Sequence, residues 1–230
     1  MKKTVIFGVF LFIFAACGPH KPTVAEQRAE KRVKDSLSMV QYAQTMRYTD
    51  SLLQTVLPES DNMLKRFKYV KNEKYADRGY YIHPQLQSAG LGQRIYLQAY
   101  VTDDFKTVVR SMYYGSRGLK HNRVTLSADS MTNTFYGDLY AFAEDGQHEI
   151  VTLGDADAVA LLQFVSAFGE NKIKVTLSGD RSYAYFLQAK DVAAMVETLR
   201  LQTLMSDIRT LEAQYKQASL QYEKYARRLR

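Results

Sequence analysis

The C-terminal part of the chain carries its longest periodic pattern, and this pattern limits the folds that the chain can adopt. Apolar residues recur there at alternating spacings of three and four, at Leu201, Leu204, Ile208, Leu211, Tyr215, Ala218, Tyr222, Tyr225 and Leu229. Such spacing gathers the side chains on one face of a helix and is typical of a helix that packs against another helix. We therefore predict a coiled-coil helix over residues 191–230.

The partner of this helix is expected within the same chain. A self-associating parallel coiled coil carries complementary charges beside its apolar seam, whereas the flanks here mix charged, amide and small residues without a pairing pattern. A second helix is predicted over 23–57, where Thr23 and Glu26 fit a capping box and Pro58 follows as a stop signal. Its apolar face comprises Met39, Tyr42, Met46, Thr49, Leu53 and Val56, broadened by Val33, Leu37 and Val40. The two helices match in length, at roughly 45 to 50 Å each for about 1.5 Å per residue, so we predict an antiparallel pair.

Between these helices the sequence changes to short alternating runs separated by Gly, Asn and Asp, which is typical of antiparallel strands. The predicted strands are 67–70, 79–83, 94–102, 106–114, 123–126, 134–142, 149–153, 172–178 and 182–188. One helix is expected within this region, over 156–168, with Asp155 as its N-cap and Gly169 as its C′ residue. A hairpin is predicted to turn at Gly179-Asp180. The fold class is therefore α+β, with an antiparallel β sandwich or partial barrel over 64–189, inserted between the two long helices.

The N-terminal segment has the three parts of an export signal. Lys2 and Lys3 precede an apolar run that is too short to span a membrane, and small residues lead to Cys17. The run Phe14-Ala15-Ala16-Cys17 resembles the lipobox of bacterial lipoprotein precursors, with Phe14 where the family usually has Leu. The resemblance implies that residues 1–16 are removed, that Cys17 is acylated, and that membrane lipid is a partner of the mature protein.

Residues 17–22 form a short tether after Cys17. Lipoproteins kept at an inner membrane resemble one another in an Asp after the cysteine, and here Gly18 stands at that position. This difference favours the outer membrane, and the sequence after Cys17 lacks the acidic run associated with surface display in some lineages, which favours the periplasmic face. Two or more acyl chains make a stable anchor.

Composition excludes several classes of partner and site. The formal net charge of +7 is modest for 230 residues, and no basic module with aromatic platforms stands out, so nucleic acid is not expected as a partner. The single cysteine excludes an intramolecular disulfide and the multi-cysteine zinc frameworks.

No catalytic or metal-binding pattern emerges from the titratable residues. The four histidines are His20, His83, His121 and His148. No two of them have metal-ligand spacing, and they are interpreted as ordinary surface or core residues. Nucleophile motifs of the Gly-x-Ser-x-Gly or Ser-x-x-Lys kind are absent from the sequence after Cys17. We predict no catalytic residue, no metal and no cofactor beyond the lipid on Cys17, and no enzyme activity.

Two groups of residues are candidate binding surfaces. The first is a loop that combines aromatic and basic groups and suits an acidic or glycan ligand: Tyr113, Tyr114, Arg117, Lys120, His121 and Arg123. The second is a basic cluster that an antiparallel helix pair would gather near the anchor: Arg28, Lys31, Arg32, Lys34, Arg227, Arg228 and Arg230. The simpler alternative for the first group is a solvated hairpin connection, and the alternative for the second is a charged helix end favoured by the helix dipole.

The function predicted from the sequence is a lipid-anchored cell-envelope protein that serves as a non-enzymatic binding or scaffolding module. Another envelope protein is the expected partner. The alternatives are a small-ligand or glycan-binding lipoprotein and a hydrolase that uses scattered carboxylates with His83 or His148.

Overall fold

The computed structural model describes residues 22–71, 79–87, 95–115, 117–142 and 148–230. Residues 1–16, Cys17 and most of the tether lie outside these ranges. In chain order the elements are α1 (Val24–Leu64), β1 (Lys68–Lys71), β2 (Gly79–Ile82), the 3-10 helix η1 (Pro84–Leu86), β3 (Tyr96–Thr102), β4 (Thr107–Tyr114), β5 (Arg123–Ala128), β6 (Met131–Tyr136), β7 (Asp138–Phe142), β8 (His148–Leu153), α2 (Asp155–Phe168), β9 (Lys174–Ser178), β10 (Ser182–Phe186) and α3 (Ala189–Leu229). Two long helices thus flank the strands, and the predicted α+β class is confirmed.

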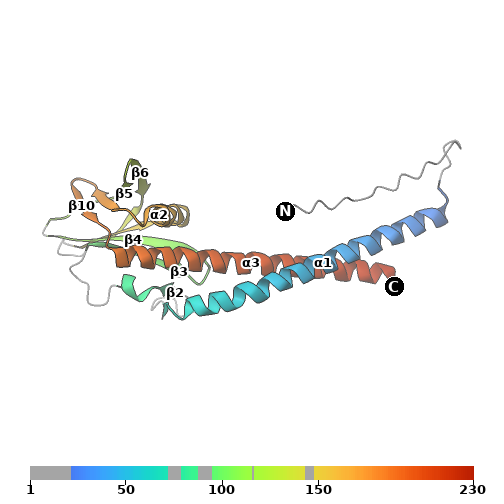
Figure 1. The fold of residues 1–230 in the computed structure, drawn as a ribbon. Coiled ribbons are helices and arrows are strands. Elements are labelled where there is room, and N and C mark those ends of the chain that lie inside the picture. Colours follow the sequence, from blue (N-terminus) through green and yellow to red (C-terminus); the bar gives the residue numbers. More distant parts are fainter. Residues whose placement is uncertain (1–21, 72–78, 88–94, 116, 143–147) are drawn as a thin grey trace.

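The helices α1 and α3 run antiparallel along each other and form a stalk, with the strands at one end (Figure 1). The antiparallel register is fixed by Tyr42, whose ring stacks on Tyr225 with centroids 5.8 Å apart, and by Glu59, which pairs with Arg200. The predicted capping box is present, because the Thr23 hydroxyl accepts from the Glu26 N–H and the Glu26 carboxylate accepts from the Thr23 N–H. The predicted partnership of the two helices is therefore correct.

Pro58 does not end α1, contrary to the prediction, and the helix continues to Leu64. A proline removes one N–H and with it the bond to the carbonyl four residues earlier, here that of Gln54. Pro58 and Gln54 are both exposed, so water can satisfy that carbonyl, while the next turn buries Ser60 and Met63. Packing of this last turn holds the helix together past the proline.

The apolar face of α1 is narrower than predicted. The residues from Met39 to Val56 that share the 3,4 spacing are buried or half-buried, whereas Val33, Leu37 and Val40 are 61%, 66% and 48% exposed. At 100° per residue these three lie almost opposite Tyr42 and Met46 on the helix. They form a second, outward stripe rather than a broad extension of the face that packs against α3.

The strands form two antiparallel sheets and no closed barrel within the described ranges. The larger sheet has the order β1-β2-β3-β4-β8-β7 and the smaller one the order β10-β9-β5-β6. Helix α2 contacts strands of both sheets and the start of α3. One continuous core joins both sheets, α2 and the first turns of α3, with buried side chains such as Leu97, Val124, Leu161, Val175 and Met195. We refer to the strands and α2 together as the β domain.

The segment 134–142, predicted as one strand, is divided between the two sheets. β6 pairs with β5 in the smaller sheet and β7 pairs with β8 in the larger one, and the chain crosses between them at Gly137. A Cβ at Gly137 would lie 2.6 Å from a methyl carbon of Val151 and 2.7 Å from the carbonyl oxygen of Thr152. Only a residue without a side chain can pass this close to β8.

The ends of α2 also differ from the prediction. Gly154 is the N-cap, and Asp155 is the first helical residue. The Asp155 carboxylate accepts the Thr107 N–H at 2.7 Å, which ties the helix start to the beginning of β4. Gly169 has a right-handed backbone conformation, so a positive φ does not explain the glycine. Glycine is favoured at this position because a side chain would crowd Val192. The hairpin at Gly179-Asp180 is confirmed, with Ile173, Val175 and Leu177 buried.

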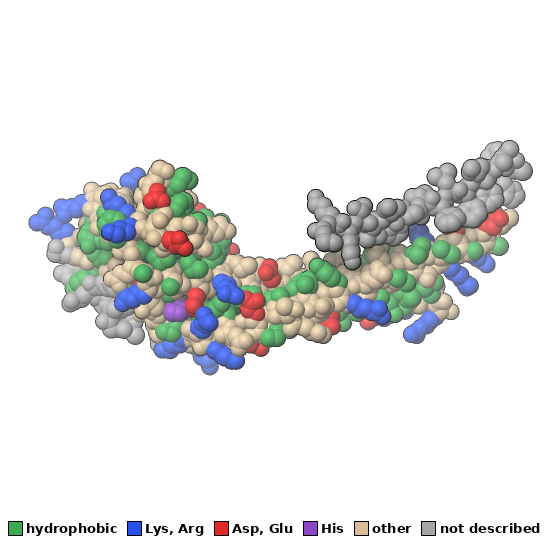
Figure 2. Space-filling view, in the orientation of Figure 1, with side chains coloured by type: hydrophobic (Ala, Val, Ile, Leu, Met, Phe, Trp, Pro, Cys, Tyr) green, Lys and Arg blue, Asp and Glu red, His purple; other side chains and the backbone are tan. Residues whose placement is uncertain are grey.

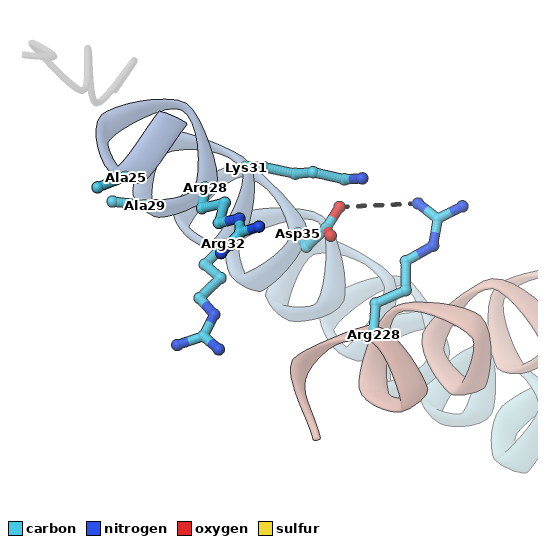
Figure 3. A pocket seen from close by; sticks show the side chains of 7 residues that line it. All are labelled: Ala25, Arg28, Ala29, Lys31, Arg32, Asp35 and Arg228. Atoms are coloured by element: carbon cyan, nitrogen blue, oxygen red, sulfur yellow. Dashed lines mark ion pairs between the residues drawn. The ribbon is translucent and has the colours of Figure 1, made fainter. Parts of the chain in front are cut away.

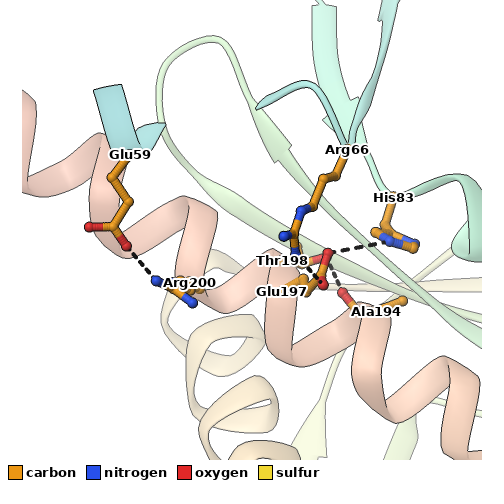
Figure 4. A network of polar contacts seen from close by, with 7 residues as sticks. All are labelled: Glu59, Arg66, His83, Ala194, Glu197, Thr198 and Arg200. Carbon is orange, nitrogen blue, oxygen red and sulfur yellow. Dashed lines mark hydrogen bonds and ion pairs between the residues drawn. The ribbon is translucent and has the colours of Figure 1, made fainter. Parts of the chain in front are cut away.

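The stalk joins the β domain through a small apolar cluster and a polar network. The cluster packs Met63 and Phe67 against Val101 of β3 and against Leu201 and Leu204 of α3. Beside it Glu197 of α3 accepts from Arg66 at 2.9 Å and lies 3.5 Å from His83, while Glu59 pairs with Arg200 (Figure 4). These contacts connect α1, η1 and α3 at one place.

Candidate functional site

The free end of the stalk is formed by the start of α1 and the end of α3 (Figure 1). Residues 24–34 of α1 are all exposed, and Asp35 is the first buried residue along the helix. The Asp35 carboxylate lies 3.8 Å from a guanidinium nitrogen of Arg228 in the last turns of α3. About three turns of α1 therefore extend beyond the pairing with α3, and we call residues 24–34 the overhang.

A groove of about 640 Å³ opens where the overhang meets the end of α3. Its lining consists of Ala25, Arg28, Ala29, Lys31, Arg32, Asp35 and Arg228. In Figure 3 Lys31 and Arg228 lie on either side of Asp35, and the Arg32 side chain points away from it; the small side chains of Ala25 and Ala29 lie on the overhang. Within the described ranges, Arg28, Lys31 and Arg32 form none of the ion pairs found, so three of the four cations have no carboxylate partner there.

The structure thus brings together four residues of the predicted basic cluster, namely Arg28, Lys31, Arg32 and Arg228. Lys34 is exposed on the overhang outside the groove, and Arg227 pairs with Glu223 one turn earlier at 3.4 Å. Arg230 is exposed after the last helical residue. Figure 2 shows Lys and Arg side chains projecting from this end of the stalk, next to exposed hydrophobic ones.

The predicted ligand loop does not form a single site. Lys120 and Arg123 are exposed and line a hollow of about 400 Å³ together with Asn122, Tyr136, Gly179 and Asp180. Lys120 is paired there with Asp180 at 3.3 Å. This hollow lies beside the turn of the β9–β10 hairpin and retains two of the six predicted residues.

The other four residues lie elsewhere. Tyr113 is buried, and its hydroxyl donates to the Arg117 carbonyl at 3.2 Å. Tyr114 packs its ring against His148, while Arg117 is exposed. His121 is fully buried, so neither it nor Tyr113 can contact a surface ligand.

His121 belongs to a buried polar network that links a loop to two strands. Its Nδ1 lies 2.7 Å from Glu149 of β8, and its Nε2 lies 3.0 Å from the Ser111 hydroxyl of β4. Glu149 also accepts the backbone N–H groups of Lys120 and His121, at 2.8 and 3.1 Å. Lys120 has a φ of 50°, a left-handed conformation that turns two successive N–H groups toward one anion. Ser111, His121 and Glu149 are all fully buried.

The environment fixes the protonation of this network. Burial lowers the pKa of His121 below its ordinary value, although Glu149 opposes that shift. For Glu149 burial acts to raise the pKa, but the hydrogen bonds from the His121 ring and from the two N–H groups outweigh it and leave the pKa lowered. At neutral pH we therefore assign a neutral imidazole whose Nδ1–H donates to ionised Glu149 and whose Nε2 accepts from Ser111.

This order of Ser, His and Glu has the connectivity of a hydrolase triad. A nucleophile must reach its substrate, and the fully buried Ser111 hydroxyl does not. The network instead fastens the 119–122 loop to the larger sheet. The histidines proposed for a hydrolase make other contacts, His83 with Glu197 and His148 with the ring of Tyr114.

Among the described residues, no helix has a stretch that is both long and apolar enough to cross a membrane. The described His, Cys, Asp and Glu side chains form no cluster of three that would hold a metal ion.

Comparison with known proteins gives little beyond this geometry. No protein-family model and no curated protein sequence matches the chain. A crystal structure of invasion associated protein B from Bartonella henselae aligns with 61% of this chain and 94% of its own length, at 16% identity and a TM-score of 0.31. Similarity at this level shows nothing about the function of this chain.

Proposed function

We propose that this chain is a lipid-anchored cell-envelope protein in which the stalk holds the β domain away from the membrane as a non-enzymatic binding or scaffolding module. One observation carries the proposal: the start of α1 and the end of α3 both lie at the end of the stalk that is remote from the β domain (Figure 1). The lipobox-like Cys17 precedes the capping residue Thr23 by only six positions. An anchor on Cys17 therefore attaches at that free end.

The length of the stalk sets the distance between the proposed lipid anchor and the β domain. Helix α1 has 41 residues, which is about 60 Å at about 1.5 Å per residue. The tether adds at most about 20 Å at roughly 3.3 Å per residue. The β domain would then act several tens of ångströms from the lipid, a distance suited to contact with another component of the envelope on the periplasmic side of the outer membrane.

The anchor is tested by a Cys17→Ala variant in intact bacteria. The unaltered protein should fractionate with outer membranes and carry acyl chains detectable by mass spectrometry, and the variant should lack both properties. Recovery of the unaltered protein in the soluble fraction without acyl chains would contradict the proposal.

The binding role needs a second measurement. A photocrosslinking residue at an exposed β-domain position, such as Tyr136, should capture an envelope protein in cells, whereas the same residue at Ser51 on the outer side of α1 should not. Crosslinks to lipid alone from both positions would contradict a scaffolding role.

The hollow at Lys120, Arg123 and Tyr136 favours a second candidate function, binding of a small acidic ligand or glycan. Two cations and an exposed tyrosine ring surround an open space of about 400 Å³ there. Calorimetry with acidic oligosaccharides should then give binding that is lost in Arg123→Ala and retained in Lys172→Ala, which removes an exposed charge outside the hollow. No heat of binding for any acidic sugar would remove this candidate.

A further inference from the structure

We infer that the groove between the overhang and the end of α3 binds the phosphate group of an anionic phospholipid. The inference rests on the proposed function, because it takes the stalk end to be anchored through Cys17. It deepens that proposal by naming the lipid chemistry that the free end recognises and the side chains that recognise it: Arg28, Lys31, Arg32 and Arg228.

The cations of α1 are not required by the stalk itself. Arg28, Lys31 and Arg32 are exposed, precede Asp35, the first buried residue of α1, and make no ion pair with the described carboxylates. The helix dipole favours cations near a C-terminus, which accounts for the basic residues at the end of α3. The same dipole gives no stabilisation to cations near the start of α1. Their presence there is explained by a negatively charged partner.

The groove has the composition of a phosphate site. Arg and Lys donate to phosphate oxygens, and Arg can do so through two parallel hydrogen bonds. Ala25 and Ala29 leave space beside these donors, and Asp35 holds Arg228 in place on the opposite side. Over residues 24–35 and 223–230 together, basic residues outnumber acidic ones eight to four, so Asp35 does not neutralise the site.

The position of the groove favours a lipid phosphate over other anions. A tether of six residues keeps α1 within about 20 Å of the acyl chains, at roughly 3.3 Å per residue. Head-group phosphates are the anions concentrated at that depth, and basic residues next to an anionic surface add to membrane binding. Occupancy of the groove would hold the stalk end on the bilayer instead of leaving it to move on the tether.

The test uses the acylated full-length mature protein in vesicles. The sequence contains no tryptophan, so Val33→Trp, at an exposed position next to Arg32, introduces a single fluorescent reporter. Vesicles carry a nitroxide on a trace head-group lipid, which quenches tryptophan at the surface. We expect quenching to be at least about twofold stronger in vesicles containing phosphatidylglycerol than in phosphatidylcholine alone, and to weaken with salt.

The charge variant replaces Arg28, Lys31 and Arg32 with Gln, and the matched control replaces three exposed lysines of the β domain and the α3 start, Lys172, Lys174 and Lys190. The first should lose the phosphatidylglycerol-dependent quenching and the second should keep it. Circular dichroism of both variants should match the parent. Equal quenching in the two vesicle types, or equal loss in both variants, would overturn the inference.

Two further arms separate the alternatives. If the acylated protein does not float with phosphatidylcholine vesicles, the proposed anchoring is wrong. If it floats but the tryptophan quenching is the same with and without phosphatidylglycerol, only the groove inference is wrong. Inorganic phosphate should reverse the quenching no better than chloride at the same ionic strength. Stronger reversal by phosphate would show a free-phosphate site and overturn the assignment to lipid.

Discussion

At the scale of single residues, Glu149 fixes the position of the loop between β4 and β5. A carboxylate on the inward face of a strand is costly unless its oxygens are satisfied, and here three donors from the 120–121 segment satisfy them. Ser111 on β4 completes the network by donating to the imidazole of His121. The loop therefore owes its position to polar contacts inside the protein, although its composition resembles that of a surface binding loop.

This network predicts that the protein loses stability toward acid. His121 has a lowered pKa when folded, so below its ordinary value of 6.5 the unfolded chain takes up a proton that the folded chain does not. Glu149 also has a lowered pKa, and its contribution is present above 4.5 and lost as the pH falls through the folded pKa. Both groups act in the same direction. The urea midpoint should fall steadily from neutral pH into the acid range.

The histidine part of this effect can be isolated by substitution. His121→Gln should be less stable at neutral pH and should lose the dependence on pH just below 6.5, and His148→Gln should keep that dependence. A His121→Gln protein with the full slope of the parent would contradict the assignment of a buried neutral imidazole.

Part of this network was detectable in the sequence. In the predicted strand 106–114 the alternation places Ser111 on the same face as Val109, and in 149–153 it places Glu149 on the same face as Val151. A glutamate on a buried strand face indicates that hydrogen-bond donors or a cation must lie next to its carboxylate. The sequence did not identify His121 as that partner, because His121 lies in a loop whose conformation depends on the left-handed backbone of Lys120.

At the scale of elements, turn positions and helix ends are decided by packing that is remote in sequence. The run 134–142 reads as one strand because glycine interrupts it only once, yet Gly137 is the place where the chain leaves one sheet for the other. Pro58 is a stop signal in an isolated helix, and the burial of Met63 overrides it. In both cases the deciding contacts, with β8 and with α3, lie far along the chain.

Gly137→Ala should destabilise the β domain by about 2 kcal/mol, in the range of overpacked core sites. The new methyl group would collide with Val151 and with the backbone oxygen of Thr152, neither of which can move without disturbing β8. Urea unfolding measures the effect. Gly154→Ser is the matched control, since nothing lies within 4 Å of a Cβ there and serine is a good N-cap. Equal midpoints for Gly137→Ala and the parent would refute the crossing at this residue.

At the scale of the whole molecule, α3 belongs to two structures at once. Its first turns bury Val192, Ala194 and Met195 in the β-domain core, and its later turns pack against α1. The antiparallel pairing of the chain ends could be predicted, because each helix carries an apolar face and the two lengths match. The groove at the free end could be foreseen only as a cluster of charges, since its shape depends on how far α1 extends past α3.

Because α3 contributes to both parts, truncating its end should unfold the start of α1 and leave the β domain folded. Ending the chain after Leu211 removes Arg228, which pairs with Asp35, and Tyr225, which stacks on Tyr42. An isolated helix of this length is marginal in water, so amides of residues 24–46 should exchange rapidly with solvent while those of β3, β4 and β8 keep their protection. Hydrogen exchange read by mass spectrometry checks this. Leu220→Ala, which changes an exposed side chain on the same stretch, should alter neither region.

The continuity of α3 also has a mechanical meaning. Its 41 residues contain neither glycine nor proline, so the helix offers no hinge between the free end of the stalk and the β-domain core. A rod of about 60 Å that tilts by about ten degrees at one end displaces the other by about 10 Å. In the proposed membrane-anchored arrangement, a change in the tilt of the free end on the bilayer would be amplified into a displacement of the sheets, and a force on the sheets would be transmitted back to the lipid.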